Sequence, residues 1–480
     1  MVFSSPIFLF GFLPITLLLY YSSPRAMKNI ILLLCSLFFY AWGEILYVLV
    51  MVASIFSNYF FGRLLGNKKR NQQKRKIYVA LGITVNLALL IFFKYSNFII
   101  ENLNKLLVTV DIAPVHLDPV HLPLGISFFT FQAISYLVDV YRKEVPAQKN
   151  ILNLSLYISL FPQLIAGPIV RYHDIALQLT GRLHSLDLFS SGVKRFVYGL
   201  AKKMLLANPL GEVADSIFAL SGNDLTLPLA WIGIFSYTLQ IFFDFSGYSD
   251  MAIGLGRMFG IRFQENFNYP YIARSLREFW RRWHISLSTW FRDYLYIPLG
   301  GSRVPTSRVY FNLLIVFILT GLWHGANWNF LLWGLFHGVF LAAEHAGLSR
   351  NLKNIGKPMQ HMYALTVIII GWVFFRTETF DQAFGYLYAM INLYNYQTTA
   401  LQFAQVLSFE AIYVFIAALM LSIPVSAWIN KNIGLVFDKY AVTSFFLIKL
   451  PQLGFVSLLL FLSIVKIASS TYNPFIYFRF

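Results

Sequence analysis

The sequence predicts an all-α protein, a polytopic bundle of helices that crosses a membrane about 12 times. Hydrophobic residues make up 58% of its 480 residues and charged residues only 12%, against about 25% charged residues in a soluble domain. The apolar residues fall into runs, many of them long enough to cross the hydrocarbon core of a bilayer. Cationic residues gather between these runs, as they do in the loops of membrane proteins.

Each predicted span is an apolar run bounded by polar or charged residues. The run at 7–21 has no basic segment before it and no small-residue cleavage site after it, so it is predicted to be a retained span and not a signal peptide. The run at 204–220 is the weakest of the set. The predicted spans cover residues 7–21, 30–41, 46–61, 77–93, 122–140, 204–220, 227–245, 309–323, 329–343, 362–375, 411–428 and 445–467.

The distribution of charge predicts which side of the membrane each loop faces. Segment 63–76 holds seven cationic residues and no acid, which places it in the cytoplasm and the N-terminus, three crossings earlier, outside. Segment 248–308 carries nine arginines against four acids and is also predicted to be cytoplasmic. Segment 94–121 is then an external loop, and the C-terminus is outside as well.

Two further segments are predicted to be irregular or interfacial. The apolar run at 152–170 contains Pro162, Gly167 and Pro168. Proline and glycine free backbone groups that lipid cannot satisfy, so this run is expected to be broken or re-entrant. Segment 194–203 is basic and amphipathic, which predicts a helix at the inner membrane interface.

Composition also excludes some classes of site. The single cysteine, Cys35, rules out an intrachain disulfide and a cysteine metal site. No cluster of histidine and carboxylate residues has metal-ligand spacing, so no metal is predicted. The net charge of +17 is typical of a nucleic-acid-binding protein, but these cations lie in loops between spans. Lipid headgroups, and not nucleic acid, are therefore the expected counter-charge.

The chemistry is expected in the stretch 279–337, which places His284 and His324 at the two ends of the predicted span 309–323. An imidazole at membrane depth is expensive to keep and marks a functional candidate. Histidine is also the side chain best suited to act as a base near neutral pH. On the residues alone, a histidine at a helix end is more often structural. His337 would lie about 220° around a continuous helix from His324, which favours a packing role.

Two charged pairs near this stretch have open roles. Arg281 and Arg282 are candidates for binding the phosphates of an acyl donor, or equally for contacting anionic lipid. Asp244 and Asp250 lie six residues apart and do not share one helix face, so they are not expected to form an acid/base pair. We expect them to anchor the arginine-rich segment 248–308.

Five motifs, in this order along the chain, resemble those of the membrane-bound O-acyltransferase (MBOAT) family. Within that family the chain looks most like the bacterial branch that acetylates alginate, and it also resembles the peptidoglycan and cellulose O-acetyltransferases. The resemblance runs from residue 1 to about residue 345. The motifs are LPLGISFFTFQ at 122–132, FPQLIAGPI at 161–169, FFDFSGYSDM at 242–251, the FWRRWH stretch at 279–294 and GLWHG at 321–325.

The resemblance implies a single membrane domain over residues 1–480, located in the bacterial cytoplasmic membrane, that moves an acetyl group from cytoplasmic acetyl-CoA to an extracytoplasmic acceptor. No permanently bound cofactor is implied. An extracytoplasmic partner of the SGNH-hydrolase type would complete transfer to an exported or cell-wall polysaccharide, so contact with the polysaccharide would be indirect. Two alternatives are D-alanyl transfer to teichoic acid and transport of a small carboxylate.

The resemblance also assigns roles to residues. The essential histidine of the family's Trp-His-Gly motif corresponds to His324. The Trp-x-x-Trp-His motif on the cytoplasmic side of the family's tunnel corresponds to Trp280 and Trp283-His284. Eukaryotic relatives have asparagine in place of His284, which argues against direct proton transfer by this residue. The residues predicted to line the donor channel or to surround it are His284, Trp280, Trp283, Arg281, Arg282, Trp323 and Asn327.

The last seven residues, 474–480, form a tail predicted to lie outside the membrane. They contain the pattern Phe475-x-Tyr477-x-x-Phe480. It looks like the C-terminal motif of the small helper peptide of teichoic-acid D-alanylation, whose tyrosine is proposed to carry the acyl group. The alternative is an aromatic belt at the membrane interface. We predict that Tyr477 shuttles the acetyl group, with Phe475 and Phe480 as anchors of the tail.

Overall fold

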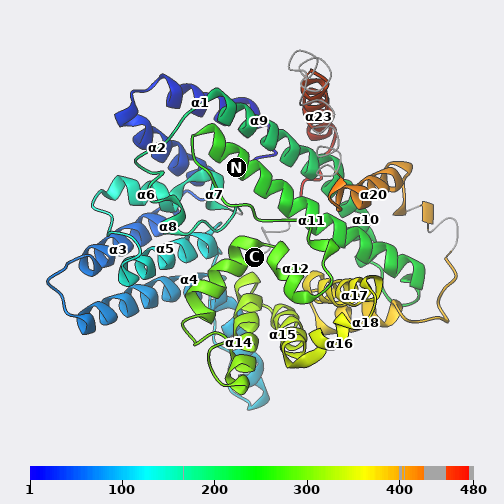
Figure 1. The fold of residues 1–480 in the computed structure, drawn as a ribbon. Coiled ribbons are helices and arrows are strands. Elements are labelled where there is room, and N and C mark those ends of the chain that lie inside the picture. The colour runs from blue at the N-terminus through cyan, green and yellow to red at the C-terminus, as the bar shows by residue number, and fades with distance from the viewer. Residues whose placement is uncertain (166, 399–402, 405, 426–449, 475–480) are drawn as a thin grey trace.

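The computed structural model describes residues 1–165, 167–398, 403–404, 406–425 and 450–474, and every regular element among them is a helix (Figure 1). The all-α prediction is therefore confirmed. Seven of the described helices are long and apolar enough to cross a membrane. The predicted total of about 12 also counts shorter helices, and it stays a prediction. The longer helices are α1 (Leu13–Ser22), α2 (Lys28–Ala41), α3 (Val48–Leu65), α4 (Gln72–Thr109), α5 (Ile126–Arg142), α6 (Ile151–Ser159), α9 (Leu186–Ala201), α10 (Asn208–Phe218), α11 (Leu227–Met258), α14 (Thr306–His324), α15 (Trp328–Ala343), α17 (Lys357–Arg376), α18 (Phe380–Ala389), α20 (Phe409–Leu421) and α23 (Leu450–Ser469).

Helix α11 runs through the centre of the bundle and is the most buried of the candidate spans (Figure 1). Helix α9 packs against it at two pairs of glycines. A Cβ atom on Gly254 would lie 2.6 Å from the carbonyl oxygen of Gly192, and one on Gly247 would lie 2.8 Å from that of Gly199. The absence of side chains at these positions is what lets the two backbones approach so closely.

Basic residues of α9 and the following π-helix η3 (Lys202–Ala207) bind the two carboxylates of α11. Lys203 lies 2.7 Å from Asp244, and Lys202 lies 2.7 Å from Asp250, which also pairs with Arg195. Segment 194–203 is part of a helical run that packs on the central helix, and its Arg195, Lys202 and Lys203 pair with that helix. Its place at the inner membrane interface stays a prediction, but one expectation is corrected here. Asp244 and Asp250 therefore hold this run, and not the arginine-rich segment.

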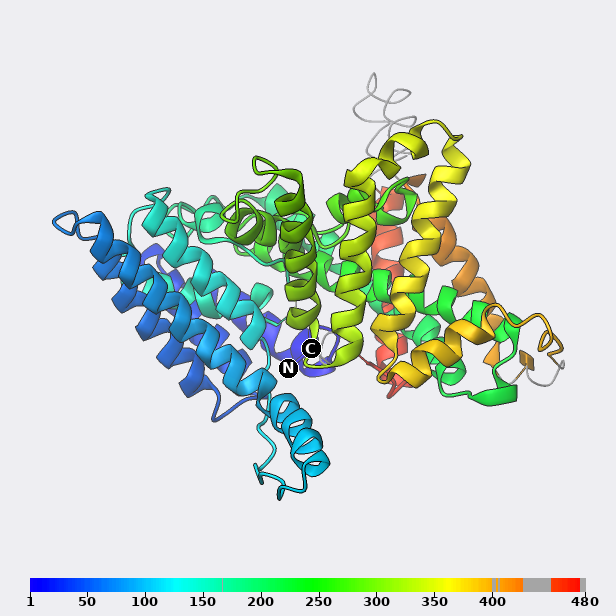
Figure 2. The same cartoon turned by 90° about the horizontal axis from the view of Figure 1, so that it is seen from below.

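Helix α4 is longer than the sequence predicts. Its 38 residues span about 57 Å, well beyond the ~30 Å hydrocarbon core of a bilayer. The predicted external loop 94–121 is thus helical as far as Thr109. The rest folds back along the helix, because the side chains of Asn97 and Asn104 bond the backbone of Val120 and Val115. This projecting end is visible in light blue in Figure 2.

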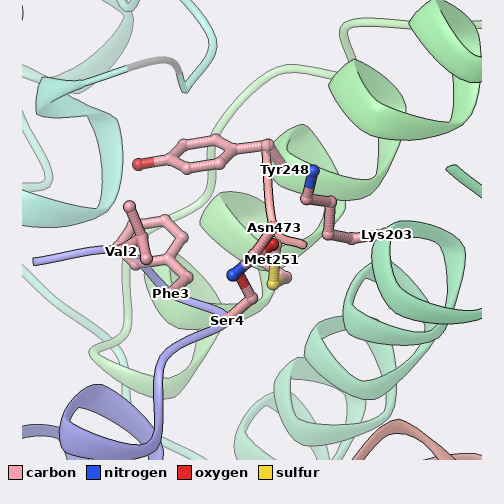
Figure 3. Close-up of a pocket in the computed structure, with 7 residues that line it drawn as sticks. All are labelled: Val2, Phe3, Ser4, Lys203, Tyr248, Met251 and Asn473. Carbon is pink, nitrogen blue, oxygen red and sulfur yellow. The ribbon is translucent and has the colours of Figure 1, made fainter. Parts of the chain in front are cut away.

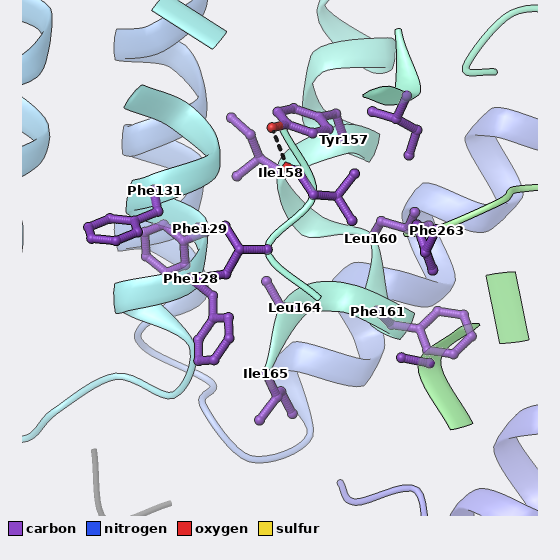
Figure 4. Close-up of a cluster of buried hydrophobic side chains, with 14 of the residues drawn as sticks. Phe128, Phe129, Phe131, Tyr157, Ile158, Leu160, Phe161, Leu164, Ile165 and Phe263 are labelled. Carbon is purple, nitrogen blue, oxygen red and sulfur yellow. Dashed lines mark hydrogen bonds between the residues drawn. The ribbon is translucent and has the colours of Figure 1, made fainter. Parts of the chain in front are cut away.

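The run at 152–170 is broken, as predicted. Helix α6 ends at Ser159, and the short helix α7 (Phe161–Leu164) follows with Pro162 in its first turn. Side chains of these two elements belong to the same buried cluster as Phe128 and Phe129 of α5, which brings two of the sequence motifs together (Figure 4).

Two buried apolar clusters fill the described bundle. One contains most of the buried residues of the N-terminal half together with Trp290 and Trp323. The other gathers α10, α11 and α17 around Trp280, Trp283 and Trp333. The stretch 279–337 contributes to both clusters and therefore lies between them.

Candidate active site

His324 is the last residue of α14 and is almost fully buried, with 3% of its surface exposed. After Gly325 the chain turns, and the side chain of Asn327 caps α15 by accepting a hydrogen bond from the Asn329 amide at 2.8 Å. Helix α15 then runs back against α14. Because the chain reverses here, His324 lies at the tip of a helical hairpin.

Three aromatic rings surround the imidazole of His324. The ring centroids of Trp323, Trp333 and Phe375 lie 5.0, 5.1 and 5.0 Å from that of His324, all in edge-on arrangements. They come from α14, α15 and α17 respectively. The imidazole thus sits in an apolar enclosure formed by three helices.

His284 joins the short helices α12 (Leu276–Arg282) and α13 (Ile285–Phe291) and has a φ of +42°. This left-handed conformation is uncommon for a residue with a side chain and is found preferentially at functional sites. The side chain of Asn266 stabilises it. Its Oδ1 atom lies 3.2 Å from Nδ1 of His284 and also accepts hydrogen bonds from the amide and hydroxyl of Ser286.

This arrangement fixes the tautomer of His284. The Asn266 amide nitrogen donates to Ser249 at 3.1 Å, which identifies the other atom of the amide as the acceptor. Nδ1 of His284 must therefore carry the proton that it donates to Asn266, and Nε2 carries the lone pair.

Both histidines lie at the same end of α14. The ring of Trp323 lies 6.0 Å from that of His284 and 5.0 Å from that of His324. The expectation that the two residues flank the span is therefore wrong. The reason is that the polar segment before α14 enters the bundle. There the ring centroid of Phe245 in α11 lies 4.5 Å from that of His284.

Helix α12 brings Trp280 and Trp283 into the same cluster. Ser275 caps this helix by accepting a hydrogen bond from the Glu278 amide, and the Glu278 carboxylate accepts one from the Arg274 amide. The buried carboxylate of Glu344 accepts hydrogen bonds from the first two amides of the helix. As a result, the ring centroid of Trp280 lies 5.7 Å from that of Trp333, and the ring centroid of Trp283 lies 4.9 Å from that of Trp372.

Several buried polar atoms in this cluster have no hydrogen-bond partner within the described ranges. They include the indole nitrogens of Trp280, Trp323 and Trp333 and the Nδ1 atom of His337. Leaving such groups unpaired costs about 1–3 kcal/mol each.

The ring centroid of His337 lies 5.2 Å from that of Trp280 and 5.1 Å from that of Trp333. Because α14 ends at His324, the continuous-helix argument does not apply, and His337 lies beside the cluster.

The remaining predicted residues differ in their surroundings. Arg282 pairs with Glu278 at 2.9 Å on its own helix, whereas the neighbouring Arg281 is exposed. Asn327 caps α15 and donates to the carbonyl of Glu378 at 3.0 Å, which holds the hairpin tip to the segment after α17. Tyr477, Phe475 and Phe480 lie outside the described residues.

Residues 472–474, which precede the last six residues, are among those that the structure describes, and they lie next to the central helix. Asn473 bonds Ser4 at 3.0 Å, and Lys203, which pairs with Asp244, also contacts the carbonyl of Pro474. Figure 3 shows Asn473 and Lys203 lining a small cavity with Ser4 and Tyr248. Phe245, which follows Asp244 in α11, contacts the ring of His284. The start of the tail is therefore joined to the candidate site through Lys203 and α11.

Sequence reasoning missed Lys94 and Asn266. Lys94 was assigned to an external loop, but it is buried and contacts the backbone carbonyl of Trp323. A cation inside the apolar run IFFKYSNFII could have signalled this role. Asn266 has no such signal, because its partners are brought together only by the fold.

One group in the described part of the chain has the spacing of metal ligands, namely Asp139, Glu144 and His173. Hydrogen bonds to Asp139 and Asp174 raise the pKa of His173 to about 9. In the structure described here His173 pairs with Asp139 at 3.0 Å and with Asp174 at 3.2 Å.

Comparison with known proteins gives a family and several relatives. Residues 68–380 match the model of the MBOAT, membrane-bound O-acyltransferase family. The chain is 41% identical, over the whole of both chains, to a probable alginate O-acetylase from Azotobacter vinelandii. It is 37% identical to a peptidoglycan O-acetyltransferase from Helicobacter pylori, over 82% of this chain and 80% of that one. A teichoic acid D-alanyltransferase from Bacillus subtilis is 28% identical over 54% of this chain and 69% of its own.

Proposed function

Because the chain belongs to the membrane-bound O-acyltransferase family, we propose that it transfers an acetyl group from cytoplasmic acetyl-CoA across the bacterial cytoplasmic membrane for O-acetylation of a polysaccharide. It is an acyltransferase, and its candidate spans make it a multi-pass membrane protein. The family also argues against the alternative of a carboxylate transporter.

The observation that carries the proposal is the position of His324, buried among three aromatic rings at the end of a membrane helix. In the proposed reaction the imidazole takes the proton of an acceptor hydroxyl while the hydroxyl oxygen attacks the thioester carbonyl. The carbon–sulfur bond then breaks. The proton passes from the imidazolium to the leaving thiolate, and the products are free CoA and an acetyl ester.

The polar groups beside His324 support a donor channel formed by Trp280, Trp283, Trp323 and His284. Nitrogens of Trp280 and Trp323 have no acceptor among the residues described. The pantetheine arm of CoA contains two amide carbonyls, which are acceptors of the kind that buried indole donors require. Arg281 is exposed and remains a candidate for the phosphates. Arg282 is a weaker candidate, because it pairs with Glu278.

We further propose that Tyr477 receives the acetyl group first. The contacts of residues 472–474 support this role, because they fix the start of the tail beside α11. Tyr477 is three residues beyond Pro474, a reach of at most about 10 Å. With His324 as base, the phenol would form an acetyl ester with a good leaving group. Phe475 and Phe480 would anchor the tail.

The final acceptor is proposed to be an exported or cell-wall polysaccharide, reached through an extracytoplasmic SGNH-type partner. Relatives named for alginate and peptidoglycan O-acetylation support this class of acceptor. Both termini would then be extracytoplasmic. D-alanyl transfer is the second candidate, supported by the relative named for that reaction, which matches a smaller part of the chain.

The proposal is tested by measuring CoA release from acetyl-CoA by the purified protein in detergent with its partner. His324→Ala should lower the rate at least about a hundredfold, since general-base catalysis contributes 10²–10⁴-fold. Size-exclusion chromatography of the variant should match the wild type. A folded variant that kept most of its activity would show that His324 is not the base.

A further inference from the structure

Lys94 is a buried cation in the middle of α4, with 7% of its surface exposed. Its Nζ atom donates to the hydroxyl of Ser127 at 3.1 Å and to the carbonyl of Trp323, and it lies 5.8 Å from the centre of the Trp323 ring. These contacts join three helices, α4, α5 and α14, at the residue that precedes His324. The family resemblance and the proposed mechanism assign no role to this lysine.

The lysine and the next residue of α4 bind the free end of α14. The last carbonyls of a helix have no partner inside the helix and carry partial negative charge. Lys94 contacts the carbonyl of Trp323, and the hydroxyl of Tyr95 donates to that of Leu322 at 2.6 Å. Together they fix the backbone immediately before His324.

A tyrosine or serine hydroxyl would suffice for a helix cap, so the charge of Lys94 needs its own explanation. Both hydrogen-bond acceptors of Lys94 are neutral, and no carboxylate pairs with it in the part of the chain that the structure describes. A cation buried in a membrane protein without a counter-ion is costly and is typically retained for function. Lys105 on the same helix shows the opposite arrangement, because it is 68% exposed and pairs with Glu101.

We infer that Lys94 is a positioning residue of the acyl-transfer site, which fixes the Trp323–His324 end of α14 and places a positive charge beside the histidine. The inference rests on the proposed function. When the acceptor oxygen attacks the thioester, negative charge develops on the carbonyl oxygen and then on the departing sulfur. A fixed cation in an enclosure of low polarity stabilises that charge far more than one in water. In this scheme His324 carries out the proton transfer, and Lys94 takes no part in it.

The test compares four variants of the full-length protein by steady-state CoA release and by thermal unfolding in detergent. Lys94→Met removes the charge and keeps the aliphatic stem. Lys94→Arg keeps a positive charge. Tyr95→Phe removes only the neighbouring cap on α14, and Lys105→Met removes an exposed charge from the same helix.

We expect Lys94→Met to lower kcat by about a hundredfold or more, the effect of removing one stabilising group from an active site, and to leave KM within about threefold. Lys94→Arg should be at least tenfold faster than Lys94→Met. Lys105→Met should keep kcat within about threefold of the wild type, and Tyr95→Phe should lower kcat at least tenfold less than Lys94→Met does. The unfolding midpoints of Lys94→Met and Tyr95→Phe should agree within a few degrees.

Three results would overturn the inference. The first is a kcat of Lys94→Met near that of the wild type. The second is an equal loss of kcat in Lys94→Met and Tyr95→Phe, which would show that Lys94 is only a cap. The third is an equal kcat in Lys94→Met and Lys94→Arg. In each case His324-dependent release of CoA by the wild type would leave the proposed function intact. Absence of that release in the wild type would instead contradict the proposed function itself.

Discussion

The side chain of Asn266 fixes both the backbone and the ring of His284. One oxygen atom serves the imidazole, an amide and a hydroxyl, while the amide nitrogen is bound by Ser249. The hydrogen bond to Asn266 holds the imidazole in one orientation beside Trp323.

The histidines could be selected from the sequence because few polar residues occur in such apolar surroundings. Their mutual placement could not, because it depends on segment 260–305 entering the bundle. Lys94 was misassigned for a related reason. It begins a polar stretch of the sequence, and only the contact with Trp323 shows that this part of α4 is buried.

The ion pairs of His173 predict a dependence of stability on pH. Two hydrogen bonds raise the pKa of His173 from about 6.5 to about 9 in the folded protein. The one to Asp139 has the larger effect and the one to Asp174 the smaller. A pKa that is higher in the folded state stabilises the protein fully below the unfolded value. This contribution is lost as pH rises from about 6.5 through 9.

The prediction is checked by following the thermal unfolding midpoint in detergent between pH 6 and pH 10. The difference between the wild type and His173→Gln should be greatest below pH 6.5 and should shrink towards pH 9. A difference that stayed constant over this range would show that His173 does not change its protonation there.

At the scale of elements, spans were predicted well where an apolar run ends at a strong boundary. The run 309–323 became α14 at Thr306–His324 and the run 329–343 became α15 at Trp328–Ala343, because Pro305, Gly325 and Asn327 terminate or cap these helices. Prediction failed for α11, which continues to Met258. Asp244 and Asp250 read as the end of a span, but cations of α9 and η3 neutralise them inside the bundle.

The glycine pairs between α9 and α11 give a prediction for this element. Gly254→Ala places a Cβ atom 2.6 Å from the Gly192 carbonyl and from the Phe196 amide nitrogen, both of them backbone atoms. The helices must therefore separate, and we expect a destabilisation of about 1–3 kcal/mol. Thermal unfolding in detergent measures it.

The matched control is Gly385→Ala in α18, where no atom lies within 4 Å of the added Cβ. Alanine is favoured over glycine in a helix, so this variant should be as stable as the wild type or slightly more stable. Equal midpoints for the two variants would refute the close packing of α9 on α11.

At the scale of the whole molecule, the two ends of the long helix α4 can be used to test the membrane topology. Asn71 caps its first turn, and Asp111 follows its last turn, about 57 Å away along the helix. If α4 spans the bilayer, these residues lie on opposite sides. The run of cations at 63–76 predicts that Asn71 is cytoplasmic.

This prediction is tested by placing a single cysteine at position 71 or 111 in a Cys35→Ser background. An impermeant maleimide added to intact cells should label position 111 and leave position 71 unlabelled until the cells are lysed. Labelling of position 71 in intact cells would reverse the predicted sidedness and the direction of transfer.

The fold class and the family could thus be inferred from the sequence, because they depend on composition and local pattern. The shared location of His284, His324 and Lys94 could not, because it depends on contacts between helices distant in the chain.

The proposed mechanism is tested most directly by asking whether His324 moves an acetyl group from acetyl-CoA onto Tyr477. The purified protein is incubated with acetyl-CoA in the absence of a partner, and the C-terminal peptide is analysed by mass spectrometry. We expect an acetyl ester on Tyr477 in the wild type and none in His324→Ala. An unmodified Tyr477 in a wild-type protein that releases CoA and supports polysaccharide acetylation with its partner would contradict this mechanism.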